Sequence, residues 1–386
     1  MNKLKDAREE VITACKRALD MGLLVRTWGN VSSRVGEDRF VITPSGRNYT
    51  ELKHGDIPIV NLRDGAFWGD IMPSMEKELH RKAYIRDEEI NFIIHTHQQE
   101  ASVLSALGMN VPLGGGDENL PEEIPCADYG FPGSDELAEN VESCLKNNPR
   151  AVLMANHGAV FTGKSQAEAL NMAASVEMYA SNIIRTAFEA YVGRPMTVND
   201  SVYTTVLKAL GFEMVESVRP FVRSERKDGE VIFYDHDGGP LEEDDTLSFD
   251  QKIHLAIYEA RPDINGIVHA LSPSLVAYSV LKHSMAAYLD DFAQINGVTM
   301  EGAPVYNEDE IAEALSSNHG VMLWENGALC CGTDIYNAEA LAIVAEKNAR
   351  CFLIGQLFKG YNLNKVPMKE AAAMREFYLE KYSKRF

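Results

Sequence analysis

The chain has 386 residues, a length that favours two domains, and its 45% hydrophobic and 24% charged residues are ordinary for a globular protein. The formal net charge of -20 argues against nucleic acid or an anionic membrane surface as the main partner, because both are bound through clustered Lys and Arg. The charged N-terminus lacks the apolar region of a signal peptide, and no stretch is long and apolar enough for a transmembrane helix. We therefore expect a cytoplasmic protein.

Hydrophobic spacing and turn residues predict an α/β fold. In chain order, the expected elements are a helix at 7–21, a strand at 40–43 ended by the turn at 44–46, a helix at 77–84, a buried strand at 92–97, a helix at 99–107, an apolar strand at 151–155 and a long helix at 168–192. The stretch 193–201 contains Gly, Pro and Asn, which makes it the best candidate for a linker.

Two pairs of segments indicate an internal repeat. EKELHRKAYIRDEEINFIIH (76–95) matches DQKIHLAIYEARPDINGIVH (250–269) at a constant offset of 174. A second pair, AVLMANHGAVFTG (151–163) and GVMLWENGALCCG (320–332), follows in the same order. We interpret this as a tandem duplication with domains at 1–196 and 197–386, chance similarity between strand–helix units being the alternative.

Three histidines in the first half form a candidate metal site. His95 and His97 are two residues apart, which on a β-strand places both side chains on one face. His157 follows a second apolar strand. If the two strands end side by side, the three imidazoles converge, and three imidazoles with an open position are a usual catalytic zinc arrangement. An incidental His-x-His is the alternative.

Five segments of the first half carry a family resemblance. They are GNVS (29–32), TPSG (43–46), PSME (73–76) with His80, HTH (95–97) and NHG (156–158). In their order and spacing they resemble the class II aldolase/adducin-head family. The resemblance implies two three-layer α/β/α domains, each with a central, mainly antiparallel sheet flanked by helices.

The same resemblance implies a zinc-dependent lyase, with other divalent ions as possible substitutes. It would cleave a ketose phosphate reversibly to dihydroxyacetone phosphate and an aldehyde, with the metal stabilising an enediolate. The implied metal ligands are His95, His97 and His157, and Glu76 is the carboxylate that moves the proton. The implied phosphate-binding residues are Gly29, Asn30, Ser45, Gly46 and Ser74.

The sequence departs from the family pattern at two places. Met75 stands where the family has the second serine of a phosphate-binding pair. The family's tyrosine after the HxH helix has no counterpart in 111–123, and Asp117, Glu118 and Tyr129 are nearby alternatives as proton donor. A sugar-phosphate epimerase, a dehydratase or a 3-oxo-acid-phosphate decarboxylase therefore remains an alternative, as does a metal-free, adducin-like interaction module.

The second half lacks most of the implied ligands. Leu271 replaces His97, Asn326 replaces His157, and of the three imidazoles only His269 is kept, so we expect no metal there. His80 and His254 occupy the same position in both halves, which favours a structural role for them.

The resemblance also implies an oligomer. Simple family members are rings of four with each active site between neighbours, and a tandem chain supplies two of those four positions. A homodimer would then close a pseudo-tetrameric ring that acts on a small, sugar-phosphate-like substrate. A monomer whose domains pack only on each other is the alternative.

Overall fold

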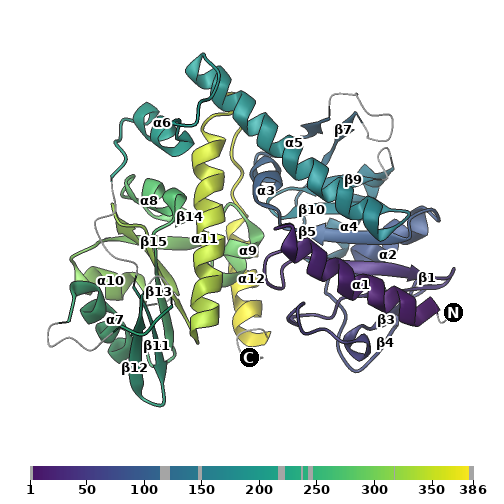
Figure 1. The fold of residues 1–386 in the computed structure, drawn as a ribbon, viewed down its shortest axis with the longest axis horizontal. Coiled ribbons are helices and arrows are strands. Elements are labelled where there is room, and N and C mark those ends of the chain that lie inside the picture. Colours follow the sequence, from purple (N-terminus) through teal and green to yellow (C-terminus); the bar gives the residue numbers. More distant parts are fainter. Residues whose placement is uncertain are drawn as a thin grey trace. The chain divides into compact units, whose positions relative to one another are not determined.

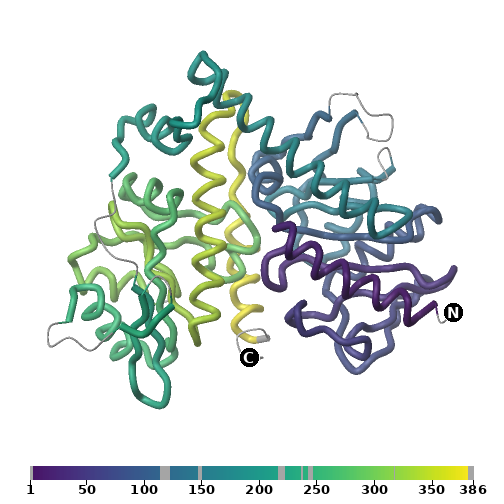
Figure 2. Tube along the Cα trace, in the orientation of Figure 1, coloured from purple at the N-terminus to yellow at the C-terminus, as the bar shows by residue number. Residues whose placement is uncertain are grey.

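The computed structural model describes residues 3–113, 122–146, 150–215, 222–235, 238–241, 247–316 and 318–381. The chain divides into two compact units, Met1–Ala190 with Asn362–Asn364, and Tyr191–Tyr361 with Lys365–Phe386. In Figure 2 the purple-to-teal trace forms the first unit and the green-to-yellow trace forms the second. Each unit is a mixed α/β structure in which helices cover a central sheet (Figure 1), as the sequence predicts.

The first unit is built on a mainly antiparallel sheet. Among its described residues the strand order is β4 (Phe67–Trp68), β3 (Ile59–Asn61), β2 (Arg39–Ile42), β1 (Asn30–Val35), β5 (Phe92–Thr96), β10 (Gly158–Gly163), β9 (Ala151–Met154) and β8 (Cys126–Ala127). The pair β8–β9 is parallel, whereas the registered pairs from β4 through β9 are antiparallel. The short strands β6 (Val111–Pro112) and β7 (Glu123–Ile124) pair separately.

Helices cover both faces of this sheet. They are α1 (Lys3–Asp20), α2 (Lys77–Arg86), α3 (Gln99–Ala106), α4 (Asp135–Leu145) and α5 (Gln166–Val192), with a 3-10 turn at His54–Asp56. Apolar residues of α2 and α4 pack on one sheet face in a core that includes Phe40, Ile93 and Val160. The helices α1 and α5 lie on the opposite face (Figure 1). The result is the three-layer arrangement that the sequence predicts.

The second unit repeats this architecture. Its described strands are ordered β12 (Glu230–Tyr234), β11 (Arg223–Lys227), β13 (Gly266–Ala270), β17 (Ala328–Gly332), β16 (Gly320–Trp324), β15 (Thr299–Pro304) and β14 (Met285–Ala286). Its helices are α6 (Val202–Ala209), α7 (Phe249–Ala260), α8 (Pro273–Ser279), α9 (Asp290–Asn296), α10 (Glu308–Ala314), α11 (Ile335–Gly355) and α12 (Met368–Lys381). Apolar side chains of α7 and α10 pack on one face of the sheet.

The two sheets correspond strand by strand, which agrees with the predicted duplication. β2, β1, β5, β10, β9 and β8 have the same order and pairing directions as β12, β11, β13, β17, β16 and β15. The parallel pair β8–β9 is repeated as β15–β16. Between β2 and α2 the first unit adds β3 and β4, which have no counterpart among the described strands between β12 and α7.

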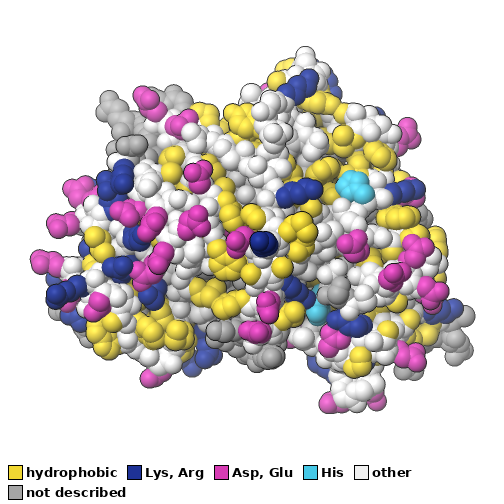
Figure 3. All heavy atoms as spheres, turned by 180° about the vertical axis from the view of Figure 1, so that it is seen from behind, with side chains coloured by type: hydrophobic (Ala, Val, Ile, Leu, Met, Phe, Trp, Pro, Cys, Tyr) yellow, Lys and Arg dark blue, Asp and Glu magenta, His cyan; other side chains and the backbone are white. Residues whose placement is uncertain are grey.

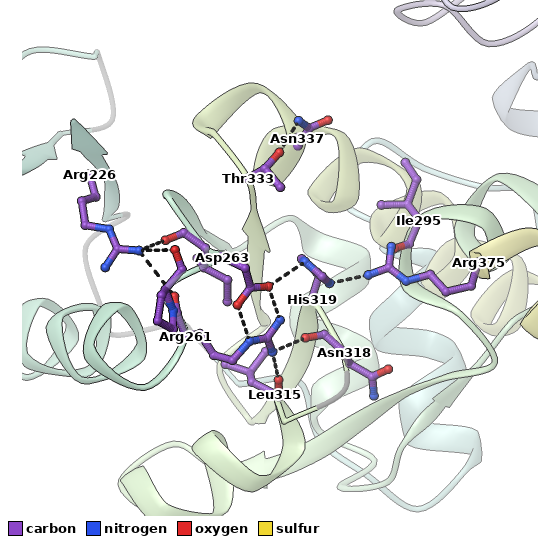
Figure 4. Close-up of polar contacts among 12 residues, drawn as sticks. Arg226, Arg261, Asp263, Ile295, Leu315, Asn318, His319, Thr333, Asn337 and Arg375 are labelled. Atoms are coloured by element: carbon purple, nitrogen blue, oxygen red, sulfur yellow. Dashed lines mark hydrogen bonds and ion pairs between the residues drawn. The ribbon is translucent and has the colours of Figure 1, made fainter. Parts of the chain in front are cut away.

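Helix α12 is held to the second unit by a buried arginine. Arg375 donates hydrogen bonds to the carbonyl oxygen of Ile295 and to Nδ1 of His319 (Figure 4). On the other side of the His319 ring, Nε2 lies 3.8 Å from Oδ2 of Asp263. The same Oδ2 forms an ion pair with Nη2 of Arg261 at 2.6 Å. Burial lowers the pKa of Arg375 to about 10 and that of His319 to about 3, so a charged guanidinium meets a neutral imidazole.

Expected and observed element boundaries differ by up to four residues, with the largest difference at the start of the first helix. Helix α1 begins at Lys3, four residues before the start predicted at 7, because its first turn is mostly exposed and charged and so adds nothing to the apolar pattern. No helix in the described ranges is both long and apolar enough to cross a membrane. Figure 3 shows acidic and basic side chains interspersed over the face that it presents.

Candidate metal centre

Two histidines of the predicted metal site, His95 and His97, lie at the end of strand β5 and just after it. His95 lies inside the strand and is fully buried, whereas His97 is half-buried and follows the last strand residue, Thr96. Their Nε2 atoms are 2.9 Å apart. The alternation predicted from the His-x-His spacing therefore continues one residue past the strand and brings both imidazoles together.

The third histidine arrives by a different route from the one expected. The strands β5 and β9 do not lie side by side, because β10 pairs with both of them. His157 occupies the β9–β10 turn, where Asn156 has a left-handed φ of 61°. Because Ala159 of β10 pairs with Thr96 of β5, this turn lies at the end of β5. Nε2 of His157 is 3.2 Å from Nε2 of His95.

The protonation of His95 fits a metal ligand. Its Nδ1 lies 3.0 Å from the carbonyl oxygen of Ala159, which can only accept, so Nδ1 carries the proton and Nε2 presents a lone pair. The possible ligand atoms of His95, His97 and His157 all lie within 4.8 Å of one another. Imidazole lone pairs this close repel one another unless a cation or proton lies between them, so the donor set fits a divalent ion.

Glu76 completes the cluster from the start of α2. Its side chain is 8% exposed, with Oε1 3.0 Å from Nε2 of His157 and Oε2 3.3 Å from Nε2 of His95. Asn30 donates a hydrogen bond of 2.6 Å to Oε2. Burial alone raises the pKa of Glu76, but the two imidazoles and the hydrogen bonds with His157 and Asn30 outweigh burial and hold that pKa well below its usual range. The carboxylate is therefore ionised.

The three loops expected to bind phosphate are joined by hydrogen bonds. The backbone N–H of Ser74 donates to the carbonyl oxygen of Thr43 at 3.0 Å, and that of Ser45 donates to Met72 at 2.9 Å. The Thr43 hydroxyl accepts from the N–H of Val31 at 3.1 Å. Among the residues on these loops expected to bind phosphate, four are partly exposed, namely Gly29, Ser45, Gly46 and Ser74.

Gly29 is required by close packing at the metal centre. A Cβ at this position would lie 2.3 Å from the carbonyl oxygen of His95, and its φ is 95°. Both observations exclude an ordinary side chain. The loop before β1 therefore approaches the backbone of a metal-ligand residue directly.

The side chain of Asn30 faces Glu76 and His80. Its side chain is 4% exposed and has both polar atoms engaged, Nδ2 by Glu76 and Oδ1 by Nε2 of His80 at 2.5 Å. The motif does not by itself predict the contacts of Asn30 with Glu76 and His80. The available signal is the spacing of Asn30 and Ser32, which places both on one face of β1 beside His80.

The two departures from the family pattern remain visible. Met75 is 37% exposed and offers no hydroxyl. Tyr129 is half-buried in the loop after β8, and its carbonyl oxygen accepts a hydrogen bond from Asn140 at 3.2 Å. Asp117 and Glu118 lie outside the described residues.

At the corresponding place in the second unit a single imidazole remains. Nε2 of His269 lies 2.8 Å from the carbonyl oxygen of Asn326, and its Nδ1 lies 3.8 Å from Asp250. Asn326 sits in the β16–β17 turn as His157 sits in the β9–β10 turn, and Leu271 follows β13 where His97 follows β5.

Comparison with known proteins identifies the fold family. Residues 9–184 and 223–353 match the family described as Class II Aldolase and Adducin N-terminal domain. The chain belongs to this family. One match falls in each unit, as expected for a tandem pair of class II aldolase domains.

Relatives of this family cover about one unit. The chain is 32% identical over 189 residues to a 5-deoxy-D-ribulose 1-phosphate aldolase of Bacillus thuringiensis, with 47% of this chain and 86% of the relative covered. It is 32% identical over 193 residues to an L-fuculose phosphate aldolase of Escherichia coli, with 48% and 86% covered. A solved L-fuculose 1-phosphate aldolase is 28% identical with a TM-score of 0.45, covering 50% of this chain and 91% of its own.

Proposed function

We propose that the first unit is a zinc-dependent class II aldolase. It cleaves a ketose phosphate reversibly to dihydroxyacetone phosphate and an aldehyde. The observation that carries this proposal is the convergence of three imidazole Nε2 atoms beside the ionised carboxylate of Glu76. The substrate class comes from the relatives, which are named as aldolases of 5-deoxy-D-ribulose 1-phosphate and of L-fuculose phosphate.

The three histidines hold the ion through their Nε2 atoms. His95 is fixed for this by its Nδ1 hydrogen bond to Ala159, and His157 is fixed by its place in the turn. Zinc, when bound, supplies a Lewis acid that polarises the substrate carbonyl and stabilises enediolate charge. His97 is half-buried, whereas His95 and His157 are buried, so His97 is the most exposed of the three.

Glu76 moves the proton at the carbon next to the carbonyl. In the direction of synthesis the ionised carboxylate would remove a proton from the hydroxyl-bearing carbon of dihydroxyacetone phosphate. That carbon would then form the C3–C4 bond to the aldehyde, whose oxygen would take up a proton from water and become the C4 hydroxyl. In the direction of cleavage the C4 hydroxyl would give its proton to water as the C3–C4 bond breaks, and Glu76, protonated in turn, would deliver a proton to C3. Because the pKa of Glu76 is held well below its usual range, the carboxylate is ionised and able to accept a proton at neutral pH.

The substrate phosphate lies against the loops at Gly29, Ser45, Gly46 and Ser74. The Ser74 hydroxyl accepts a hydrogen bond from the N–H of Glu76 at 3.3 Å, which leaves its own proton for an anionic oxygen. Gly46 has a φ of 65°, a turn geometry that lets the backbone approach an oxyanion closely. Met75 removes one hydroxyl from this cradle.

The second unit serves as a metal-free partner domain, and the chain forms a homodimer that closes a pseudo-tetrameric ring. Its sheet and helices repeat those of the first unit, whereas Leu271 and Asn326 stand where two ligands are needed. A domain that keeps the fold but lacks two of the metal ligands can contribute to assembly without catalysing the reaction.

The test is an activity screen with the metal controlled. Protein stripped by a chelator and reloaded with zinc is incubated with ketose 1-phosphates, ketose 5-phosphates and 3-oxo acids. We expect dihydroxyacetone phosphate from a ketose 1-phosphate, and only after reloading. Epimerisation or decarboxylation without cleavage would contradict the aldolase assignment, and full activity after stripping would contradict the metal.

A further inference from the structure

A row of buried hydrogen bonds leads from the core of the first unit to the carboxylate of Glu76. The Tyr84 hydroxyl is 2.8 Å from Oγ of Ser32, which is 2.7 Å from Nδ1 of His80. Nε2 of His80 is 2.5 Å from Oδ1 of Asn30, whose Nδ2 is 2.6 Å from Oε2 of Glu76. All five side chains belong to buried residues of β1 and of the segment that forms α2.

The direction of each hydrogen bond follows from the chemistry of its ends. An ionised Glu76 can only accept, so the amide of Asn30 must turn Nδ2 toward it and Oδ1 toward His80. Nε2 of His80 therefore carries the proton, and Nδ1 accepts from Ser32. Burial lowers the pKa of His80 to about 3, so the imidazole stays neutral with one fixed tautomer.

The second unit keeps the start of this row and loses its end. Oγ of Ser224 is 2.8 Å from Nδ1 of His254 and 2.9 Å from the hydroxyl of Tyr258. Val222, however, stands where the first unit has Asn30, and Nε2 of His254 has no hydrogen-bond partner among the described residues. The serine–histidine–tyrosine part is thus common to both units, whereas the amide accompanies the glutamate and the metal cluster.

We propose that Asn30 and His80 are positioning residues that hold the Glu76 carboxylate against His157. Both act through Glu76, Asn30 by direct contact and His80 through Asn30. Asn30 fixes Oε2 by direct donation, which leaves Oε1 facing His157, and His80 prevents the amide of Asn30 from turning over. The catalytic part of this inference rests on the proposed aldolase function, whereas the orientation of Glu76 does not.

The second unit supplies matched control variants. Asn30→Val copies Val222, and His80→Asn keeps a partner for Ser32 while removing the donor to Asn30. His254→Asn makes the same change where no amide and no metal cluster follow. We expect Asn30→Val and His80→Asn to leave zinc content and KM unchanged. Their kcat should fall about 10–100-fold, the usual cost of removing a hydrogen-bond partner of a side chain at a metal site. His80→Gln, which can still donate toward Asn30, should recover most of the loss, and His254→Asn should keep wild-type kcat.

Thermal stability separates positioning from folding. If His80→Asn and His254→Asn lose similar stability and both keep kcat at a temperature where they are folded, His80 is only structural and the inference is wrong. A crystal structure of Asn30→Val tests the orientation of Glu76 even if the protein does not catalyse the proposed reaction. We expect Glu76 to leave its contact with His157 there. An unmoved carboxylate overturns the inference, whereas a displaced one supports it even if the protein cleaves no ketose phosphate.

Discussion

His80 and His254 make the same hydrogen bond in two units with different centres. Nδ1 of each lies close to a strand serine, 2.7 Å from Oγ of Ser32 and 2.8 Å from Oγ of Ser224. The framework around the sheet is therefore repeated, while among the described residues the three-histidine cluster occurs in the first unit. Each residue of the candidate centre can be compared with an internal counterpart that shares its packing.

The carboxylates Glu76 and Asp250 provide the first comparison. We expect Glu76→Gln to retain most of the zinc and to lower kcat by about 10²–10⁴-fold, the usual cost of losing a positioned acid or base. Asp250→Asn should change kcat little, because no three-histidine cluster lies beside it among the described residues. Steady-state kinetics at matched zinc content test this, and equal losses from both substitutions would contradict the metal-free role of the second unit.

Alanine substitutions at Gly29 and Gly36 distinguish the steric cost of an added side chain from its conformational cost. Both have positive φ, 95° and 68°, but a Cβ at Gly36 meets nothing within 4 Å. Gly36→Ala should cost about 1–2 kcal/mol in the free energy of unfolding through its left-handed backbone alone. Gly29→Ala should cost about 1–3 kcal/mol more through overpacking. It should also weaken zinc binding, because it presses on the backbone of His95. Equal losses of stability, with zinc affinity unchanged, would rule out this role for Gly29.

The burial of His254 in the second unit predicts that the free energy of unfolding depends on pH. Burial lowers the pKa of His254 from 6.5 to about 3, so below pH 6.5 the unfolded chain takes up a proton that the folded chain does not. The stabilising contribution is therefore complete above pH 6.5 and is lost as the pH falls toward 3, by about a few kcal/mol. Denaturant unfolding from pH 7 to 4 should give a shallower decline for His254→Gln than for the wild type. Parallel curves would show that this proton uptake is absent.

The assembly prediction depends on the duplication. A homodimer should have a mass near twice the 42.9 kDa of the chain, and light scattering measures it directly. A stable monomer with full activity would end the ring proposal without affecting the metal centre.

The sequence predicts the clustering of the three histidines well and the surroundings of the cluster less well. The motifs at 95–97 and 156–158 lead directly to the histidine cluster, because strand alternation and a turn are local properties. The insertion of β10 between β5 and β9 is a matter of strand order, which no local pattern encodes.

The link between Ser32 and His80 was hidden by unequal spacing. These residues are 48 apart, whereas Ser224 and His254 are 30 apart, because β3 and β4 have no counterpart among the described residues between β12 and α7. A repeat search at one constant offset therefore finds His254 and misses Ser224. The side-chain partners of Asn30 are Glu76 and His80, and these contacts depend on where α2 packs. A four-residue motif around Asn30 carries no information on that packing.

The central claim is that one metal centre lies in the first unit. Elemental analysis of chelator-stripped, zinc-reloaded protein tests it most directly. We expect one zinc per chain in the wild type and in Asp250→Asn. His157→Asn, which copies Asn326, should retain almost none. A wild type with no zinc or with two per chain, or a His157→Asn variant that keeps a full equivalent, would contradict the account.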